Sequence, residues 1–176
     1  GFGADLRIAD IGQVIRLGAL ADDGFLHFHE IADMGVLADL GAYPDEGATI
    51  PESTALMAVG PYAIPRVDVE IRSVLTNKTP LGAYRGAVRP EATALIERAV
   101  DMLAAELGID PAEIRRRNFI HGFPHRTVTD ASYDSGAYEQ ALDEALRLSD
   151  YDSLRREQTE RRRSHDPRLL GIGIAS

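Results

Sequence analysis

The residues best suited to chemistry lie in a short loop of small residues that leads into a helix. Arg85 keeps its charge at every physiological pH and offers a planar fork of donors for anionic oxygens. Gly82 and Gly86 let the backbone approach a bound group closely. Pro90 and Glu91 are typical of a first helical turn, where the helix dipole is positive. The stretch predicts a site for a phosphate, a carboxylate or an oxo group; the alternative is an ordinary strand-to-helix connection with a surface arginine.

Two elements must position this loop. Apolar and polar residues alternate over 66–76, which predicts a half-buried strand before the loop. A helix over 90–107 is predicted after it, because one stripe carries Ala92, Leu95, Ile96, Ala99, Val100, Leu103 and Leu107, with Glu97, Arg98, Asp101 and Glu106 elsewhere. Gly108 is suited to end this helix in a left-handed conformation, and Asp110 to cap a second helix beginning at Pro111.

The remaining patterns indicate an α+β fold. Alternating stretches at 13–20 and 25–32 flank a turn and predict a hairpin. Pro51 marks the start of a short helix, Asp134–Gly136 is expected to cap a third main helix, and 151–163 has helical propensity. We therefore predict a mixed, largely antiparallel sheet with helices packed on one side.

Composition narrows the classes of function. The absence of cysteine excludes disulfides, iron–sulfur ligation and thiolate zinc sites from this stretch, and is compatible with a cytoplasmic protein. A net charge of −9 argues against a nucleic-acid binder, and no apolar run is long enough to span a membrane. The chain is expected to be a partial domain, residues 1–176, truncated at both ends, with Gly171–Ser176 as an interrupted strand.

Two further groups of residues were weighed as sites. His27 and His29 would share one face of a strand at a metal-binding spacing, but no third ligand is evident, so we predict hydrogen-bonded or solvent-facing histidines and no metal site. Arg115, Arg116 and Arg117 point three ways around a helix, so they cannot all address one ligand. We interpret them as a solvated face with local ion pairing.

The loop and its surroundings resemble a known family. The order of motifs is similar to that of the molybdenum hydroxylases, the xanthine dehydrogenase and aldehyde oxidase family, which includes large chains like that of carbon monoxide dehydrogenase. The resemblance covers roughly residues 35–176 and rests on these stretches: Leu40–Tyr43, Gly60–Pro65, Thr76–Ala92, Ile96–Arg98, Glu106–Pro111, Arg115–Asn118, Phe123–Pro124, Tyr133–Tyr138 and Gly171–Ala175.

The resemblance implies a molybdenum–molybdopterin cofactor and roles for the loop. Arg85 would lie beside the substrate face of the metal and stabilise developing negative charge. Gly86, Ala87 and Val88 would bring backbone close to the cofactor, although relatives usually carry glycine where this chain has Val88. The family's catalytic glutamate lies downstream of this chain, so the isolated fragment is expected to be inactive.

The resemblance also implies substrates and partners. Such enzymes hydroxylate aldehydes or N-heterocycles with water as the oxygen source, or oxidise carbon monoxide, and pass electrons to iron–sulfur (Fe-S) and FAD centres on partner subunits or domains. Members that oxidise carbon monoxide carry a copper-binding cysteine directly after the loop arginine, where this chain has Gly86, so that chemistry is disfavoured. From the resemblance we also expect a small-molecule substrate and a possible homodimer of the assembly. We expect no nucleic-acid partner and no membrane span.

Two other readings stay open from the sequence. A non-catalytic α/β module that binds protein or a small anion needs neither cofactor nor glutamate; a long downstream reading frame with further glycine-rich loops would favour the enzyme instead. A nucleic-acid binder built on the arginine clusters is the weakest reading, and salt-sensitive retention on heparin would support it.

Overall fold

The structure is a computed structural model that describes residues 13–22, 25–39, 49–74 and 82–176. Predicted features within the remaining ranges, which include Leu40–Tyr43 and Thr76–Leu81, lie outside the described residues. Among the described residues, no helix is both long and apolar enough to cross a membrane.

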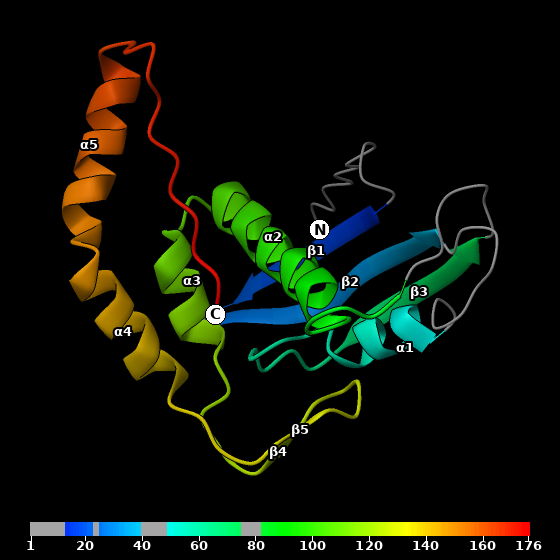
Figure 1. The fold of residues 1–176 in the computed structure, drawn as a ribbon. Helices are drawn as coiled ribbons and strands as arrows, with labels where there is room; N and C mark the ends of the chain where they lie inside the picture. The colour runs from blue at the N-terminus through cyan, green and yellow to red at the C-terminus, as the bar shows by residue number, and fades with distance from the viewer. Residues whose placement is uncertain (1–12, 23–24, 40–48, 75–81) are drawn as a thin grey trace.

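A three-stranded sheet forms the back layer of the molecule (Figure 1). Strands β1 (Gln13–Asp22) and β2 (Phe25–Asp39) pair antiparallel, as the predicted hairpin requires, and β2 extends beyond the predicted stretch. Strand β3 (Val67–Val74) pairs with β2 in parallel, with Ala32 opposite Val67. The sheet is therefore mixed, which confirms the predicted class.

Helices lie on one face of this sheet (Figure 1). Helix α1 contacts β2 and β3, α2 contacts β1, and α3 contacts β2. Helices α4 and α5 follow one another beside these three, and α4 contacts α3. Their bounds are α1 Thr49–Leu56, α2 Arg89–Leu107, α3 Pro111–Asn118, α4 Tyr138–Leu148 and α5 Tyr151–Arg163.

The ends of α2 and α3 follow the predicted chemistry. Gly108 has φ 66° and ends α2 in the left-handed region, where a residue without a Cβ carries no steric penalty. Asp110 Oδ1 accepts from the backbone N–H of Ala112 at 2.8 Å and of Glu113 at 3.4 Å. It therefore satisfies amides that have no partner within the helix. The predicted N-cap of α3 is confirmed.

The predicted cap of the third main helix is wrong. Helix α4 is preceded by Ala137, which provides no side-chain cap, and Asp134 Oδ1 accepts from the neighbouring Ser135 hydroxyl instead. Tyr138, the first residue of the helix, packs its ring against Phe119 with centroids 5.8 Å apart and also contacts Phe123 and Tyr133. The start of α4 is therefore tied to the core by ring contacts and carries no polar cap.

One core joins the turn after α1 to α2 and α3. Tyr62 and Phe119 stack with parallel rings at 5.6 Å, and the apolar stripe of α2 packs around them. Every residue of the predicted stripe from Ala92 to Leu103 is buried. A short hairpin, β4 (His125–Arg126) with β5 (Ser132–Tyr133), follows α3 and was not predicted, because two-residue strands carry no readable alternation.

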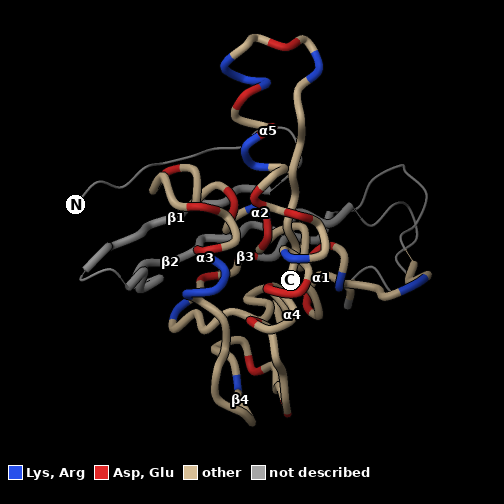
Figure 2. The backbone as a smooth tube through the Cα atoms, turned by 90° about the vertical axis from the view of Figure 1, so that its left-hand side faces the viewer, with Lys and Arg blue, Asp and Glu red and all other residues tan. Residues whose placement is uncertain are grey.

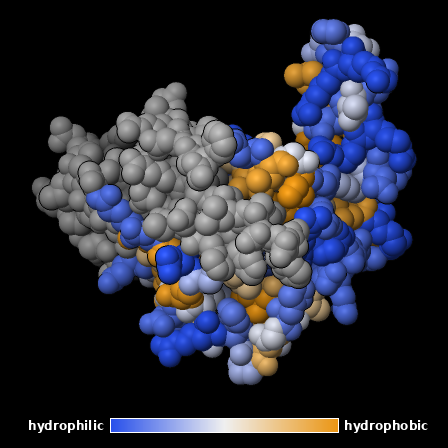
Figure 3. Space-filling model, turned by 180° about the vertical axis from the view of Figure 1, so that it is seen from behind, coloured by the Kyte–Doolittle hydropathy of each residue, from blue (hydrophilic) through white to orange (hydrophobic). Residues whose placement is uncertain are grey.

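Helix α5 and the segment that follows it form an arm that projects beyond the core (Figure 1). Figure 3 shows that the visible surface of this arm is largely hydrophilic. Its base is fixed by Asp110, whose carboxylate accepts from the Tyr151 hydroxyl at 3.1 Å and pairs with Arg155 at 3.3 Å. Residues 165–176 then return along α5 and α4 towards the core.

Candidate cofactor-binding loop

The arginine loop, residues 82–88, connects the β3 side of the sheet to α2. Its first five residues are exposed, and the Tyr84 side chain is 98% exposed. An added Cβ at Gly82 or Gly86 would meet no atom within 4 Å in the described chain. The backbone at these two glycines is therefore open to a close approach from outside.

Two left-handed residues shape the end of the loop. Gly86 has φ 68° and Val88 has φ 72°. Glycine adopts this region freely, but a β-branched residue is strained there. Val88 is buried, with 8% of its surface exposed, so packing of its side chain offsets the strain. Its carbonyl accepts from the Ala92 N–H at 2.9 Å, which begins α2.

The loop presents donors without acceptors. Within the described chain, the backbone N–H groups of Ala87, Val88 and Glu91 donate to no partner. In the same described residues, the side chains of Arg85 and Arg89 make neither ion pairs nor hydrogen bonds. These groups surround the positive end of a 19-residue helix. The donor set fits an anionic group rich in oxygen, which is the character expected of a pterin phosphate or an oxo centre.

A cavity of about 450 Å³ lies between the loop and α1. Ala87 and Val88 line it from the loop, and Ser53 and Met57 line it from α1 and the turn that follows. Arg85 does not line this cavity and is exposed beside it. Of the predicted site residues, two therefore border a cavity, while Arg85 and Gly86 lie on the open surface of the same loop.

A second polar cluster joins α2 to α3 in the core, and the sequence prediction missed it. The Glu97–Arg115 cluster consists of Tyr62, Glu97, Asp101 and Arg115. Arg115 is fully buried and donates from Nε to Glu97 Oε2 at 2.8 Å, while its guanidinium pairs with Asp101 at 2.9 Å. Glu97 Oε1 accepts from the Tyr62 hydroxyl at 2.8 Å. Burial, together with the neighbouring Glu97 charge, raises the pKa of the Tyr62 hydroxyl.

This cluster corrects two predictions. Arg115 is buried, so interpreting it as part of a solvated face was wrong; Arg116 and Arg117 do form the predicted surface ion pairs with Glu113. Glu97 is also buried, although the apolar stripe excluded it. Arg115 lies three residues after the buried Ala112, on the same face of α3, and that spacing was the signal that the sequence offered.

The structure does not test the prediction for His27 and His29, but it shows how the charged residues are distributed. The side chains of His27 and His29 lie outside the described residues, and no group of three potential metal ligands occurs among the described ones. Positive and negative residues are interspersed along the described backbone in Figure 2.

Comparisons with known proteins identify relatives. Residues 14–119 match the molybdopterin cofactor-binding domain. The chain is 47% identical to the carbon monoxide dehydrogenase large chain of Hydrogenophaga pseudoflava over an alignment of 122 residues, and the match covers 66% of this chain and 15% of that one. It is 32% identical to the nicotine 6-hydroxylase large subunit of Paenarthrobacter nicotinovorans over 123 residues, covering 70% and 15%.

A solved structure has the same fold. Quinoline 2-oxidoreductase from Pseudomonas putida 86 superposes with a TM-score of 0.69 at 28% identity, covering 86% of this chain and 20% of that chain. The present chain thus spans between about a seventh and a fifth of the length of these relatives.

Proposed function

The chain belongs to the molybdopterin cofactor-binding domain family, and we propose that it forms part of the catalytic large subunit of a molybdenum-dependent hydroxylase. In this proposal residues 1–176 are a partial cofactor-binding domain. The observation that supports it best is the arginine loop, with its open glycines, its unpartnered amides and an arginine free of ion pairs in the described chain.

Each part of the loop has a separate role in the proposal. The bound molybdenum–molybdopterin group would supply two-electron oxidation with oxygen taken from water. Gly86, Ala87 and Val88 would hold that group by backbone contact, since no side chain projects over Gly86. Arg85 would donate hydrogen bonds to negative charge that develops on the substrate, because its fork stays protonated throughout turnover.

We propose an aldehyde or an N-heterocycle as the substrate. Two of the relatives are named for nicotine and quinoline, which are both N-heterocycles. A third is named for carbon monoxide, but this chain has Gly86 directly after Arg85 and contains no cysteine. A glycine cannot hold copper through a thiolate at that position, so carbon monoxide oxidation through copper is disfavoured.

The proposal also includes partners for electron transfer. With no cysteine in the chain, an iron–sulfur cluster ligated by thiolates must be bound elsewhere. An Fe-S subunit and an FAD subunit, or equivalent domains of the same protein, would accept the electrons.

The test is analysis of the complete protein, purified with the products of neighbouring genes. We expect stoichiometric molybdenum and pterin, and hydroxylation of aldehydes or N-heterocycles. Active material that persistently lacks molybdenum would overturn the proposal and favour a non-catalytic binding module.

A variant then tests the loop itself. Arg85→Ala should lower turnover by about 100-fold, the usual effect of removing one transition-state donor, while molybdenum content stays intact. Arg98→Ala is the matched control, since Arg98 is an exposed arginine on α2 that lies outside the loop. Equal turnover in the two variants would remove Arg85 from the site.

A further inference from the structure

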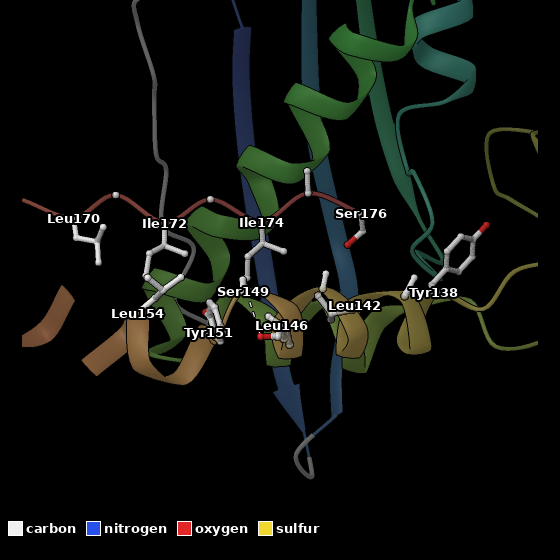
Figure 4. Close-up of a pocket in the computed structure, with 15 residues that line it drawn as sticks. Tyr138, Leu142, Leu146, Ser149, Tyr151, Leu154, Leu170, Ile172, Ile174 and Ser176 are labelled. Atoms are coloured by element: carbon white, nitrogen blue, oxygen red, sulfur yellow. Dashed lines mark hydrogen bonds between the residues drawn. The ribbon is translucent and has the colours of Figure 1, made fainter. Parts of the chain in front are cut away.

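The returning segment, residues 170–176, has the alternation of a β-strand although no strand pairs with it among the described residues. Ile172 and Ile174 are half-buried, whereas Gly171, Gly173 and Ala175 are exposed. Figure 4 shows the side chains of Leu170, Ile172 and Ile174 pointing towards α4 and α5. They line one wall of an apolar cavity of about 540 Å³ between these helices and the segment. One face of the segment is therefore anchored.

One edge of the segment is partly hydrogen-bonded, by side chains in place of a neighbouring strand. The Leu170 carbonyl accepts from Gln158 Nε2 at 3.0 Å, and the Ile174 carbonyl accepts from buried Arg115 at 2.8 Å. The Ser176 N–H donates to Glu97 Oε1 at 3.1 Å. All three backbone groups belong to even-numbered residues, which point to the same edge of an extended chain.

The opposite edge is open. The N–H and C=O groups of Gly171, Gly173 and Ala175 have no hydrogen-bond partner in the described chain. An added Cβ at either glycine would meet nothing within 4 Å in the described chain, so the face of the segment that points away from α4 and α5 is uncovered as well. An extended row of backbone groups, held at three points along one edge and unpaired on the other, is a template for strand pairing.

We propose that residues 170–176 are an edge strand whose odd-numbered residues pair with an extended strand of the same large subunit, from outside residues 1–176. This inference rests on the proposed function, in which the chain is part of a longer protein. The relatives named above are about five to seven times longer than the matched stretch, which provides such strands within one polypeptide. The anchor of the inner edge is itself buried in the Glu97–Arg115 cluster, which suits a permanent intramolecular pairing.

Amide hydrogen exchange on the complete subunit tests this pairing at single-residue resolution. We expect the amides of Gly171, Gly173 and Ala175 to exchange at least about 100-fold more slowly than unprotected amides. Exchange at the unprotected rate would overturn the proposal. Protection that occurs only after the Fe-S and FAD subunits bind would overturn the assignment of the partner strand to the same polypeptide.

A pair of variants at one position separates pairing from packing. Gly173→Pro removes the N–H from the open edge, and Gly173→Ala keeps it while adding a methyl group to open space. Only the proline variant should accelerate exchange at Gly171 and Ala175, by at least about tenfold. Indistinguishable exchange in the two variants would contradict strand pairing. The measurement works on protein without molybdenum, so its outcome is independent of the cofactor test.

Discussion

The arginine loop and the Glu97–Arg115 cluster are both built from arginine and both lie at α2, yet their arginines have opposite environments. Arg85 is exposed and without an ion-pair partner in the described chain, whereas Arg115 is fully buried and contacts two carboxylates and three backbone carbonyls. A guanidinium with all its donors satisfied stabilises the fold, while one with free donors is available to a ligand. The same residue type thus serves structure in one region and is free for chemistry in the other.

The largest effect is expected from the buried arginine. Arg115→Met should lower the free energy of unfolding by about 3–5 kcal/mol, because Glu97 would stay buried without its countercharge. Denaturant unfolding of the purified protein measures this. Arg117→Ala is the control, since its ion pair with Glu113 is exposed and should contribute under about 1 kcal/mol. A loss below about 1 kcal/mol for Arg115→Met would show that the cluster is not essential to the fold.

A smaller effect is expected at Val88, where the loop meets the core. Val88→Gly and Val88→Ala both remove buried methyl groups, but only glycine relieves the left-handed strain. We expect the glycine variant to be more stable than the alanine variant by about 1 kcal/mol in denaturant unfolding. The reverse order would mean that the chain at Val88 is not held in this conformation.

The third prediction concerns pH. Burial and the carboxylate of Asp110 raise the pKa of Tyr151 to about 12. A raised pKa means that the fold favours the protonated phenol, so this contribution is complete below the ordinary value of about 10 and is lost as pH rises towards 12. Tyr151→Phe should therefore flatten the decline in unfolding free energy between those two pH values. An identical decline in the variant would exclude this hydroxyl as a cause.

The smallest effect on stability is expected at the loop arginine. Arg85→Ala removes no contact within the described chain, so the free energy of unfolding should change by less than about 0.5 kcal/mol. Denaturant unfolding alongside Arg115→Met completes the comparison. A loss above about 1 kcal/mol would place Arg85 among the structural arginines and weaken its proposed role in turnover.

Local signals in the sequence predicted the elements that carry the site. Helix α2 was predicted because its stripe repeats over about four turns, and the ends at Gly108 and Asp110 because their chemistry acts within a few residues. The burial of Arg115 was missed because its partners are distant: Glu97 is 18 residues away and Ile174 is 59 residues away. No local pattern reports such a contact.

The site was predicted only in part for a similar reason. The position of Arg85 before a helix is a local property and could be read directly. The positive φ of Val88 could not, since valine disfavours that region and only the surrounding packing imposes it. Which loop residues border the cavity depends on α1, an element some thirty residues earlier in the chain.

Asp110 links the base of the arm to the core through a single carboxylate. That group serves the first turn of α3, a phenol and a guanidinium at the same time. One carboxylate therefore supports three interactions. Neutralising Asp110 would weaken the start of α3 and the attachment of α5 at the same time. The direction in which α5 projects is therefore fixed at its first residue, Tyr151, by Asp110, which lies 41 residues earlier in the chain.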